Sequence, residues 1–99
     1  MSQALRWQCE EGVLSLQGEL VHNSLSELWQ QRRQALGGVK IIDVSRLSRV
    51  DSAGLALLVH FSTSSADQEV VALQGVIPAL HSLIMLYNLS DVLSYQVGV

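Results

Sequence analysis

The chain has 99 residues, of which 48% are hydrophobic and only 15% are charged, and its mean hydropathy is +0.29. This length gives a single domain, and the high hydrophobicity excludes intrinsic disorder. A net charge of −3 argues against binding to nucleic acid. Globular chains usually carry about 25% charged residues, so we expect part of this surface to be apolar and to meet a partner.

Basic residues are confined to the N-terminal half, where all six Lys and Arg lie between Arg6 and Arg49. The stretch 70–90 carries no charge, yet we expect no membrane-spanning helix, because polar and helix-breaking residues interrupt it: Gln74, Gly75, Pro78, His81 and Asn88. The first residues lack the apolar core of a signal peptide. Cys9 has no second cysteine to pair with, which fits a reducing compartment. We therefore expect a cytoplasmic protein.

In chain order, hydrophobic periodicity predicts strand Leu5–Cys9, strand Val13–Gly18, helix Val21–Leu36, strand Val39–Val44, helix Ser52–Ser65, strand Glu69–Leu73 and helix Pro78–Tyr87. Glu11-Gly12 forms a turn between the first two strands. Ser24, followed by Glu27 three residues later, has the spacing of a capping box, and Gly37-Gly38 ends that helix. Pro78 fits the first turn of the last helix.

This order predicts one α/β domain over residues 1–99. We expect a mixed, mostly parallel sheet with an N-terminal hairpin, flanked by helices.

Catalytic and metal-binding motifs are absent from the sequence. It has no phosphate-binding GxxxxGK[ST], no GxGxxG after a strand and no GxSxG nucleophile elbow. His22, His60 and His81 lie far apart and lack zinc-ligand spacing. A Ser-His-Asp triad assembles from distant positions, so sequence alone leaves it open. We nevertheless expect a protein that is not an enzyme and binds no metal or cofactor.

Residues 41–58 are the most informative segment, with a buried strand, a short polar loop and then a helix. Asp51 or Ser52 supplies the N-cap of this helix. Gly54 in its first turn lowers the stability of the helix by about 1 kcal/mol relative to Ala. A glycine at this position indicates either a close approach of another backbone segment or a residue that is merely tolerated. The helix N-terminus would favour a phosphate on Ser52, whereas Asp51 opposes an anion there.

Both sides of this helix are apolar. On a wheel of 100° per residue with Ser52 at zero, Leu57, Leu58 and Phe61 fall at about 140°, 240° and 180° and form the core face. Such a helix needs cover on its other side too, from its own domain or from a partner. We favour a partner-binding surface made of Ser52, Leu55, Ala56, Val59 and Thr63. Ser52 and Asp51 then act as a helix cap or a regulatory phosphosite.

The segment resembles the STAS domain, whose members include anti-sigma factor antagonists with a D-S-[SAT]-G turn, here Asp51-Ser52-Ala53-Gly54. The longer resemblance is to one group of the family, the MlaB-like subunits of the phospholipid ABC transporters of Gram-negative bacteria. The matching segments cover most of the chain: Gly18–Leu20, Leu28–Trp29, Ile42–Leu58, Leu73–Val76 and Leu86–Leu89. Members of this group often have Thr where this chain has Ser52, so the hydroxyl is kept.

This resemblance implies a non-catalytic accessory subunit. MlaB-like subunits bind the cytoplasmic ATPase (MlaF-like) beside the permease (MlaE-like) and support a transporter that maintains outer-membrane lipid asymmetry. The protein would lie at the cytoplasmic face of the inner membrane through its partner. Two copies are expected per transporter, because the ATPases of ABC transporters act in pairs.

Two other functions remain open from the sequence. The chain could be an anti-sigma factor antagonist that a kinase phosphorylates at Ser52. It could also be an independent lipid-binding or hydrolytic protein, which would be active without a partner.

Overall fold

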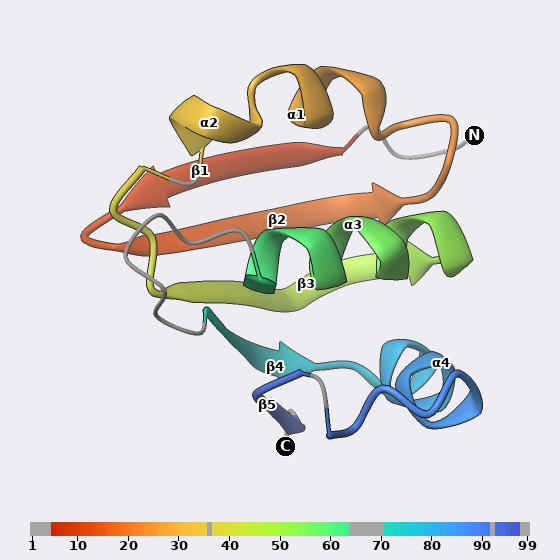
Figure 1. Ribbon diagram of the computed structural model, residues 1–99. Coiled ribbons are helices and arrows are strands. Elements are labelled where there is room, and N and C mark those ends of the chain that lie inside the picture. The colour runs from red at the N-terminus through yellow and green to blue at the C-terminus, as the bar shows by residue number, and fades with distance from the viewer. Residues whose placement is uncertain (1–4, 36, 64–70, 92, 98–99) are drawn as a thin grey trace.

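A mixed sheet forms the centre of the computed structural model, which describes residues 5–35, 37–63, 71–91 and 93–97 (Figure 1). In these residues the sheet has five strands in the order β1-β2-β3-β4-β5. Their bounds are Arg6–Glu10 (β1), Val13–Leu20 (β2), Ile41–Val50 (β3), Ala72–Val76 (β4) and Tyr95–Val97 (β5). The helices are Ser26–Gln30 (α1), Arg32–Ala35 (α2), Ser52–Thr63 (α3) and Pro78–Leu86 (α4).

Strand directions confirm the predicted fold class. β1 and β2 pair antiparallel, and each later pair of neighbours is parallel. Glu10 pairs with Val13, so the hairpin loop consists of Glu11 and Gly12 alone. Their φ angles, 51° and 79°, are both positive, as in the type I′ turn that matches the twist of a hairpin. The predicted turn is confirmed.

Strand β3 is longer than predicted. Residues 45–50, expected to be a loop, continue the strand and pair with β2 up to Leu20 and Val50. The register shifts twice along β2, between Ser15 and Gln17 and again between Gly18 and Glu19. These irregularities place successive polar side chains of β3 on the exposed side, namely Ser45-Arg46 and Ser48-Arg49. These polar pairs interrupt the alternation of apolar and polar side chains that is typical of a strand. The sequence pattern therefore predicted a loop at this position.

The single helix predicted over Val21–Leu36 is wrong. The structure has two short helices, α1 and α2, with Gln31 between them, and Leu36 lies outside the described residues. A turn at Gly37-Gly38 follows α2, as expected.

Ser24 does not cap a helix, which corrects the predicted capping box. Leu25 occupies the N-cap position of α1 and makes no side-chain hydrogen bond there. The Ser24 hydroxyl instead donates to the carbonyl oxygen of Glu19 at 2.6 Å and accepts the backbone N–H of Val21 at 3.1 Å. Ser24 thus closes the turn after β2, a local use of its hydroxyl that competes with capping.

The C-terminal half follows the prediction with shifted boundaries. α3 ends at Thr63, and the predicted residues 64–65 and 69–70 lie outside the described part. β4 runs on to Val76, and Pro78 stands in the first turn of α4 as expected. β5 was not predicted; it adds to β4 with Tyr95 opposite Leu73. Among the described residues, no helix has the length and apolar character that crossing a bilayer requires.

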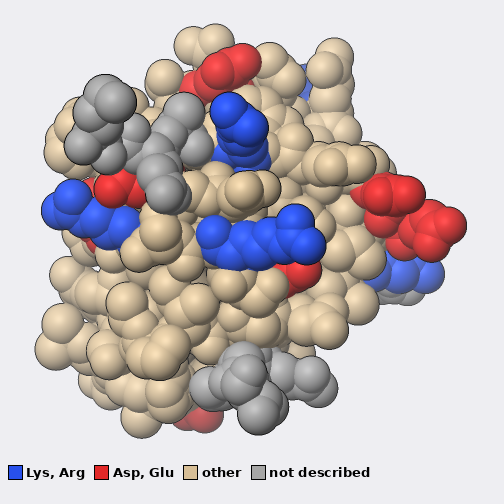
Figure 2. Space-filling view, turned by 180° about the vertical axis from the view of Figure 1, so that it is seen from behind, with Lys and Arg blue, Asp and Glu red and all other residues tan. Residues whose placement is uncertain are grey.

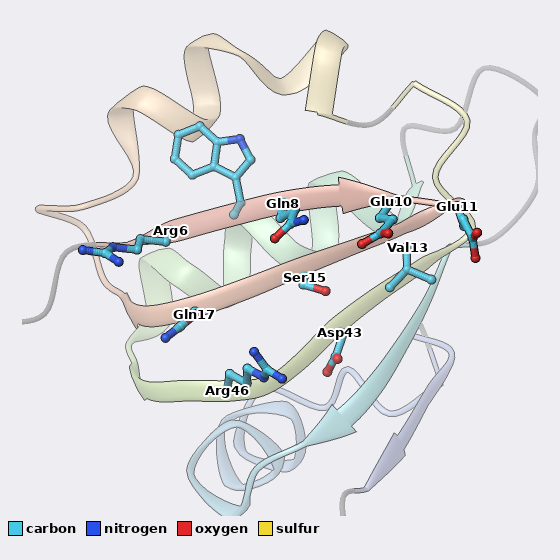
Figure 3. A pocket seen from close by; sticks show the side chains of 10 residues that line it. Arg6, Gln8, Glu10, Glu11, Val13, Ser15, Gln17, Asp43 and Arg46 are labelled. Carbon is cyan, nitrogen blue, oxygen red and sulfur yellow. The ribbon is translucent and has the colours of Figure 1, made fainter.

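Helices cover one face of the sheet. In Figure 1, α3 lies in front of the sheet, with α1 and α2 on one side of it and α4 on the other. Side chains from the sheet and helices form one core, whose fully buried members include Leu14, Leu16, Leu20, Ile42, Val44, Leu58, Phe61, Leu73, Leu80 and Ile84. Parallel strands are usually covered on both faces. Figure 2 shows the molecule from behind, where basic and acidic side chains lie on the surface. The polar strand residues Ser15, Gln17, Asp43 and Arg46 share one hollow on the open face of the sheet (Figure 3).

Candidate functional site

Helix α3 begins at a side-chain cap supplied by Asp51. Its carbonyl oxygen accepts the backbone N–H of Leu55 at 2.9 Å, and its Oδ1 accepts the backbone N–H of Gly54 at 2.9 Å. These are the two bonds of an N-cap residue. Of the two predicted candidates, Asp51 is therefore the cap, and Ser52 is the first helical residue.

The same carboxylate joins α3 to the turn after β2. Asp51 Oδ2 accepts the backbone N–H of His22 at 3.1 Å and lies 3.5 Å from its Nδ1. Burial is the largest single influence on the pKa of Asp51 and acts to raise it. The backbone N–H groups of Gly54 and His22, together with the His22 side chain, outweigh burial, so the pKa lies below its ordinary value.

Gly54 brings α3 against the end of β2. A Cβ at this position would collide with the carbonyl oxygen of Leu20, and Gly54 itself is buried. Of the two readings left open by the sequence, the close backbone approach is therefore the correct one. The contact fixes how near the first turn of α3 lies to the sheet.

Leu55 does not belong to an exposed surface, which corrects the predicted docking face. It is only 2% exposed, while Leu57, Leu58 and Phe61 are buried as expected. The flank of α3 that carries Leu55 is opposite the flank of His60, which contacts α1. Leu55 is thus buried within the domain itself, in which α3 also contacts α4.

The remaining predicted residues leave a narrower exposed surface. Ser52 and Ala56 are exposed and Val59 is half-buried, and we call these three residues the α3 strip. The side chain of Thr63 lies outside the described residues. No charged side chain belongs to the α3 strip, although Asp51 lies directly before it. Because Ser52 is exposed, its hydroxyl is accessible from outside the chain.

An aromatic contact borders the α3 strip. The rings of Trp29 in α1 and His60 in α3 have centroids 4.7 Å apart and are tilted by 58°. The guanidinium carbon of Arg32 lies 4.3 Å from the centre of the Trp29 ring, and Arg32 Nη1 donates to the Trp29 carbonyl oxygen at 2.8 Å. The sequence analysis missed this cluster. Its signal was the Arg three residues after Trp29, which places both on one side of a helical turn.

The three histidines lie in separate places. His22 contacts Asp51, His60 contacts Trp29, and His81 contacts Tyr95, with ring centroids 5.8 Å apart. Within the part of the chain that the structure describes, no group of three or more His, Cys, Asp or Glu could hold a metal ion.

A polar hollow of about 630 Å³ lies on the open face of the sheet. Figure 3 shows Arg6 toward one end and Glu10 and Glu11 toward the other, with Asp43 and Arg46 on β3 between them. The described residues that line it include no histidine or cysteine. Asp43 Oδ1 already accepts both the backbone N–H and the hydroxyl of Ser45, at 2.9 and 2.7 Å. The described residues that line the hollow therefore carry charges of both signs.

Comparisons with known proteins assign the chain to a family. A family model described as "Mlab, STAS domain" matches residues 3–94. The intermembrane phospholipid transport system binding protein MlaB of Escherichia coli (strain K12) is 45% identical over 95 residues, which cover 94% of this chain and 98% of that protein. The protein of the same name from Shigella flexneri matches to the same extent.

A solved structure supports the fold. An anti-sigma factor antagonist from Mycobacterium paratuberculosis matches with a TM-score of 0.71, covering 95% of this chain and 85% of that chain at 20% identity. This similarity concerns the fold alone, whereas the family model and the two curated relatives span nearly the whole chain. The chain belongs to the MlaB family of STAS domains, as the resemblance of its sequence segments predicted.

Proposed function

We propose that this protein is the STAS subunit of a phospholipid-transporting ABC transporter of the Mla type, which maintains outer-membrane lipid asymmetry. Its 45% identity to a protein named as part of an intermembrane phospholipid transport system supports this function. Near-complete coverage of both chains supports it further, since no additional domain of that relative is left unmatched.

The proposed role is to bind the cytoplasmic ATPase subunit through the α3 strip. The observation that carries this proposal is an exposed, uncharged helix surface of Ser52 and Ala56 beside half-buried Val59. Small side chains let the backbone of a partner helix approach closely, and the Ser52 hydroxyl adds a hydrogen-bonding group at the N-terminal end of the contact.

The subunit acts without chemistry of its own in this proposal. It supports assembly and activity of the ATPase, beside the permease, at the cytoplasmic face of the inner membrane. Two copies bind per transporter, one on each ATPase of the pair.

Co-purification tests the docking surface. The chain is co-expressed with the tagged ATPase subunit of its transporter, either unchanged or as Ala56→Asp. The matched control is Ser82→Asp, which introduces the same charge at an exposed position of α4. Ala56→Asp should abolish co-purification and Ser82→Asp should leave it intact, with both variants folded by circular dichroism. Retention of the complex by Ala56→Asp would disprove the docking surface.

Phosphorylation at Ser52, as in an anti-sigma factor antagonist, is the second candidate function. The exposed hydroxyl supports it, but the Asp51 carboxylate already accepts a backbone N–H at this helix N-terminus and would repel a phosphate. Incubation with cell lysate and ATP, followed by intact mass and peptide mapping, tests it. A protein that gains no phosphate on Ser52 argues against this function.

A further inference from the structure

The cluster beside the α3 strip has the composition of a binding anchor. Trp29 is 38% exposed although it contacts both His60 and Arg32. Trp and Arg are enriched among the interface residues that contribute most to binding. Because His60 belongs to α3 itself, the cluster and the α3 strip form one continuous surface across three helices, α1, α2 and α3.

Arg32 is held in place before any partner binds. Its guanidinium lies over the Trp29 ring and, within the described parts of the chain, donates one hydrogen bond, to the Trp29 carbonyl oxygen at 2.8 Å. A guanidinium has five N–H donors in a planar fork, so further donors remain for an acceptor outside the chain. Holding the side chain in advance lowers the entropy lost on binding.

No carboxylate of the described chain neutralises this site. The ion pairs among the described residues join His22 to Asp51 and Arg49 to Glu19, and neither includes Arg32 or Arg33. A hollow of about 400 Å³ lies here, lined by two guanidinium and three amide side chains: Gln30, Gln31, Arg32, Arg33 and Gln34. Guanidinium groups recognise carboxylates through paired hydrogen bonds, and amide side chains bind peptide groups.

We propose that this hollow binds an acidic segment of the ATPase subunit, with a carboxylate on Arg32 next to Trp29. The inference rests on the proposed function and adds the chemistry of the partner. The partner would place small or apolar side chains on the α3 strip and Asp or Glu over α2. Charge complementarity selects this occupant, because the hollow presents basic side chains and no acidic one.

Affinity measurements with purified ATPase subunit at two salt concentrations test the inference. Arg32→Ala should raise Kd about ten-fold or more at low salt and reduce the salt dependence of binding. Arg32→Lys should also weaken binding, because an ammonium lacks the planar fork. The charge-matched control is Arg46→Ala, on the open face of the sheet, with Kd within about two-fold of the unchanged chain (Figure 3).

The outcomes separate the two proposals. If Ala56→Asp abolishes binding while Arg32→Ala binds like the unchanged chain, the acidic-segment inference is wrong and the α3 strip stands. If Ala56→Asp binds normally while Arg32→Ala loses salt-dependent affinity, the α3 strip is wrong and the acidic-segment inference stands; if the unchanged chain does not bind the ATPase subunit, both fail. If Arg32→Ala weakens binding equally at both salt concentrations, the guanidinium only holds Trp29 in place, and the carboxylate contact is disproved.

Discussion

Asp51 and His22 lie 29 positions apart in the sequence. At the start of α3, the Asp51 carboxylate contacts both the backbone N–H and the side chain of His22. Asp51 Oδ2 accepts the His22 backbone N–H at 3.1 Å, while Oδ1 caps the helix through Gly54. One carboxylate therefore holds the turn after β2 and the first turn of α3 together. The placement of the neighbouring Ser52 depends on this connection.

Removing the cap should destabilise the domain. Asp51→Ala leaves the N–H groups of Gly54 and His22 without their acceptor, so we expect a loss of about 1 kcal/mol in the free energy of unfolding. Ser52→Ala should change it by less than about 0.5 kcal/mol, because that side chain is exposed. Urea unfolding of both variants measures the difference. Equal losses would mean that Ser52 shares the capping role.

The charge of Asp51 should make stability depend on pH. Its folded-state pKa lies below the ordinary value of 3.8, so the ionised carboxylate stabilises the fold above that value. This contribution is lost as the pH falls through the lowered folded-state pKa. Asp51→Asn keeps a capping oxygen and removes the charge.

Unfolding midpoints between about pH 2 and pH 7 give the measurement. The unchanged chain should be more stable than Asp51→Asn at neutral pH, and the difference should shrink below about pH 4. Asp91→Asn, at an exposed carboxyl, serves as the control. A difference between the unchanged chain and Asp51→Asn that stays constant across the range would contradict the lowered pKa.

Much of the fold was predictable because its local patterns agree with the tertiary structure. The Glu11-Gly12 turn, the helix after Asp51 and Pro78 at the start of α4 all carry residues that suit their backbone geometry. The extension of β3 was not predictable, since the register shifts against β2 break its alternation. β5, with three residues, is too short for a periodic pattern.

The candidate site was predicted only in part. A helical wheel of α3 identified its core side chains correctly. It assigned Leu55 to the surface because a wheel describes one helix and does not include the contacts made by neighbouring elements. The rest of the domain, in which α3 contacts α4, buries Leu55. The contact between Trp29 and His60 joins two elements far apart in the sequence, and it depends on how α1 lies beside α3.

The burial of Leu55 has a measurable consequence. Leu55→Ala should lower the free energy of unfolding by about 2–5 kcal/mol, because it removes buried methyl groups and leaves a cavity. Ala56→Ser, one residue later on the exposed side, should change it by less than about 0.5 kcal/mol. Both values come from urea unfolding. A small effect of Leu55→Ala would return this residue to the docking surface.

Gly54→Ala separates helix propensity from tertiary packing. Propensity alone predicts a gain of about 1 kcal/mol, since Ala favours a helix over Gly. The added Cβ would collide with the Leu20 carbonyl oxygen, a backbone atom that cannot rotate away. We therefore expect a net loss of about 1–3 kcal/mol in the free energy of unfolding. Gly37→Ala, where a Cβ would make only ordinary contacts at 3.6 Å and beyond, is the control and should be nearly neutral.

The same Gly54→Ala change should weaken the proposed binding to the ATPase subunit, because moving the first turn of α3 away from β2 displaces Ser52. A stabilised Gly54→Ala variant with normal binding would show that α3 does not need this close approach.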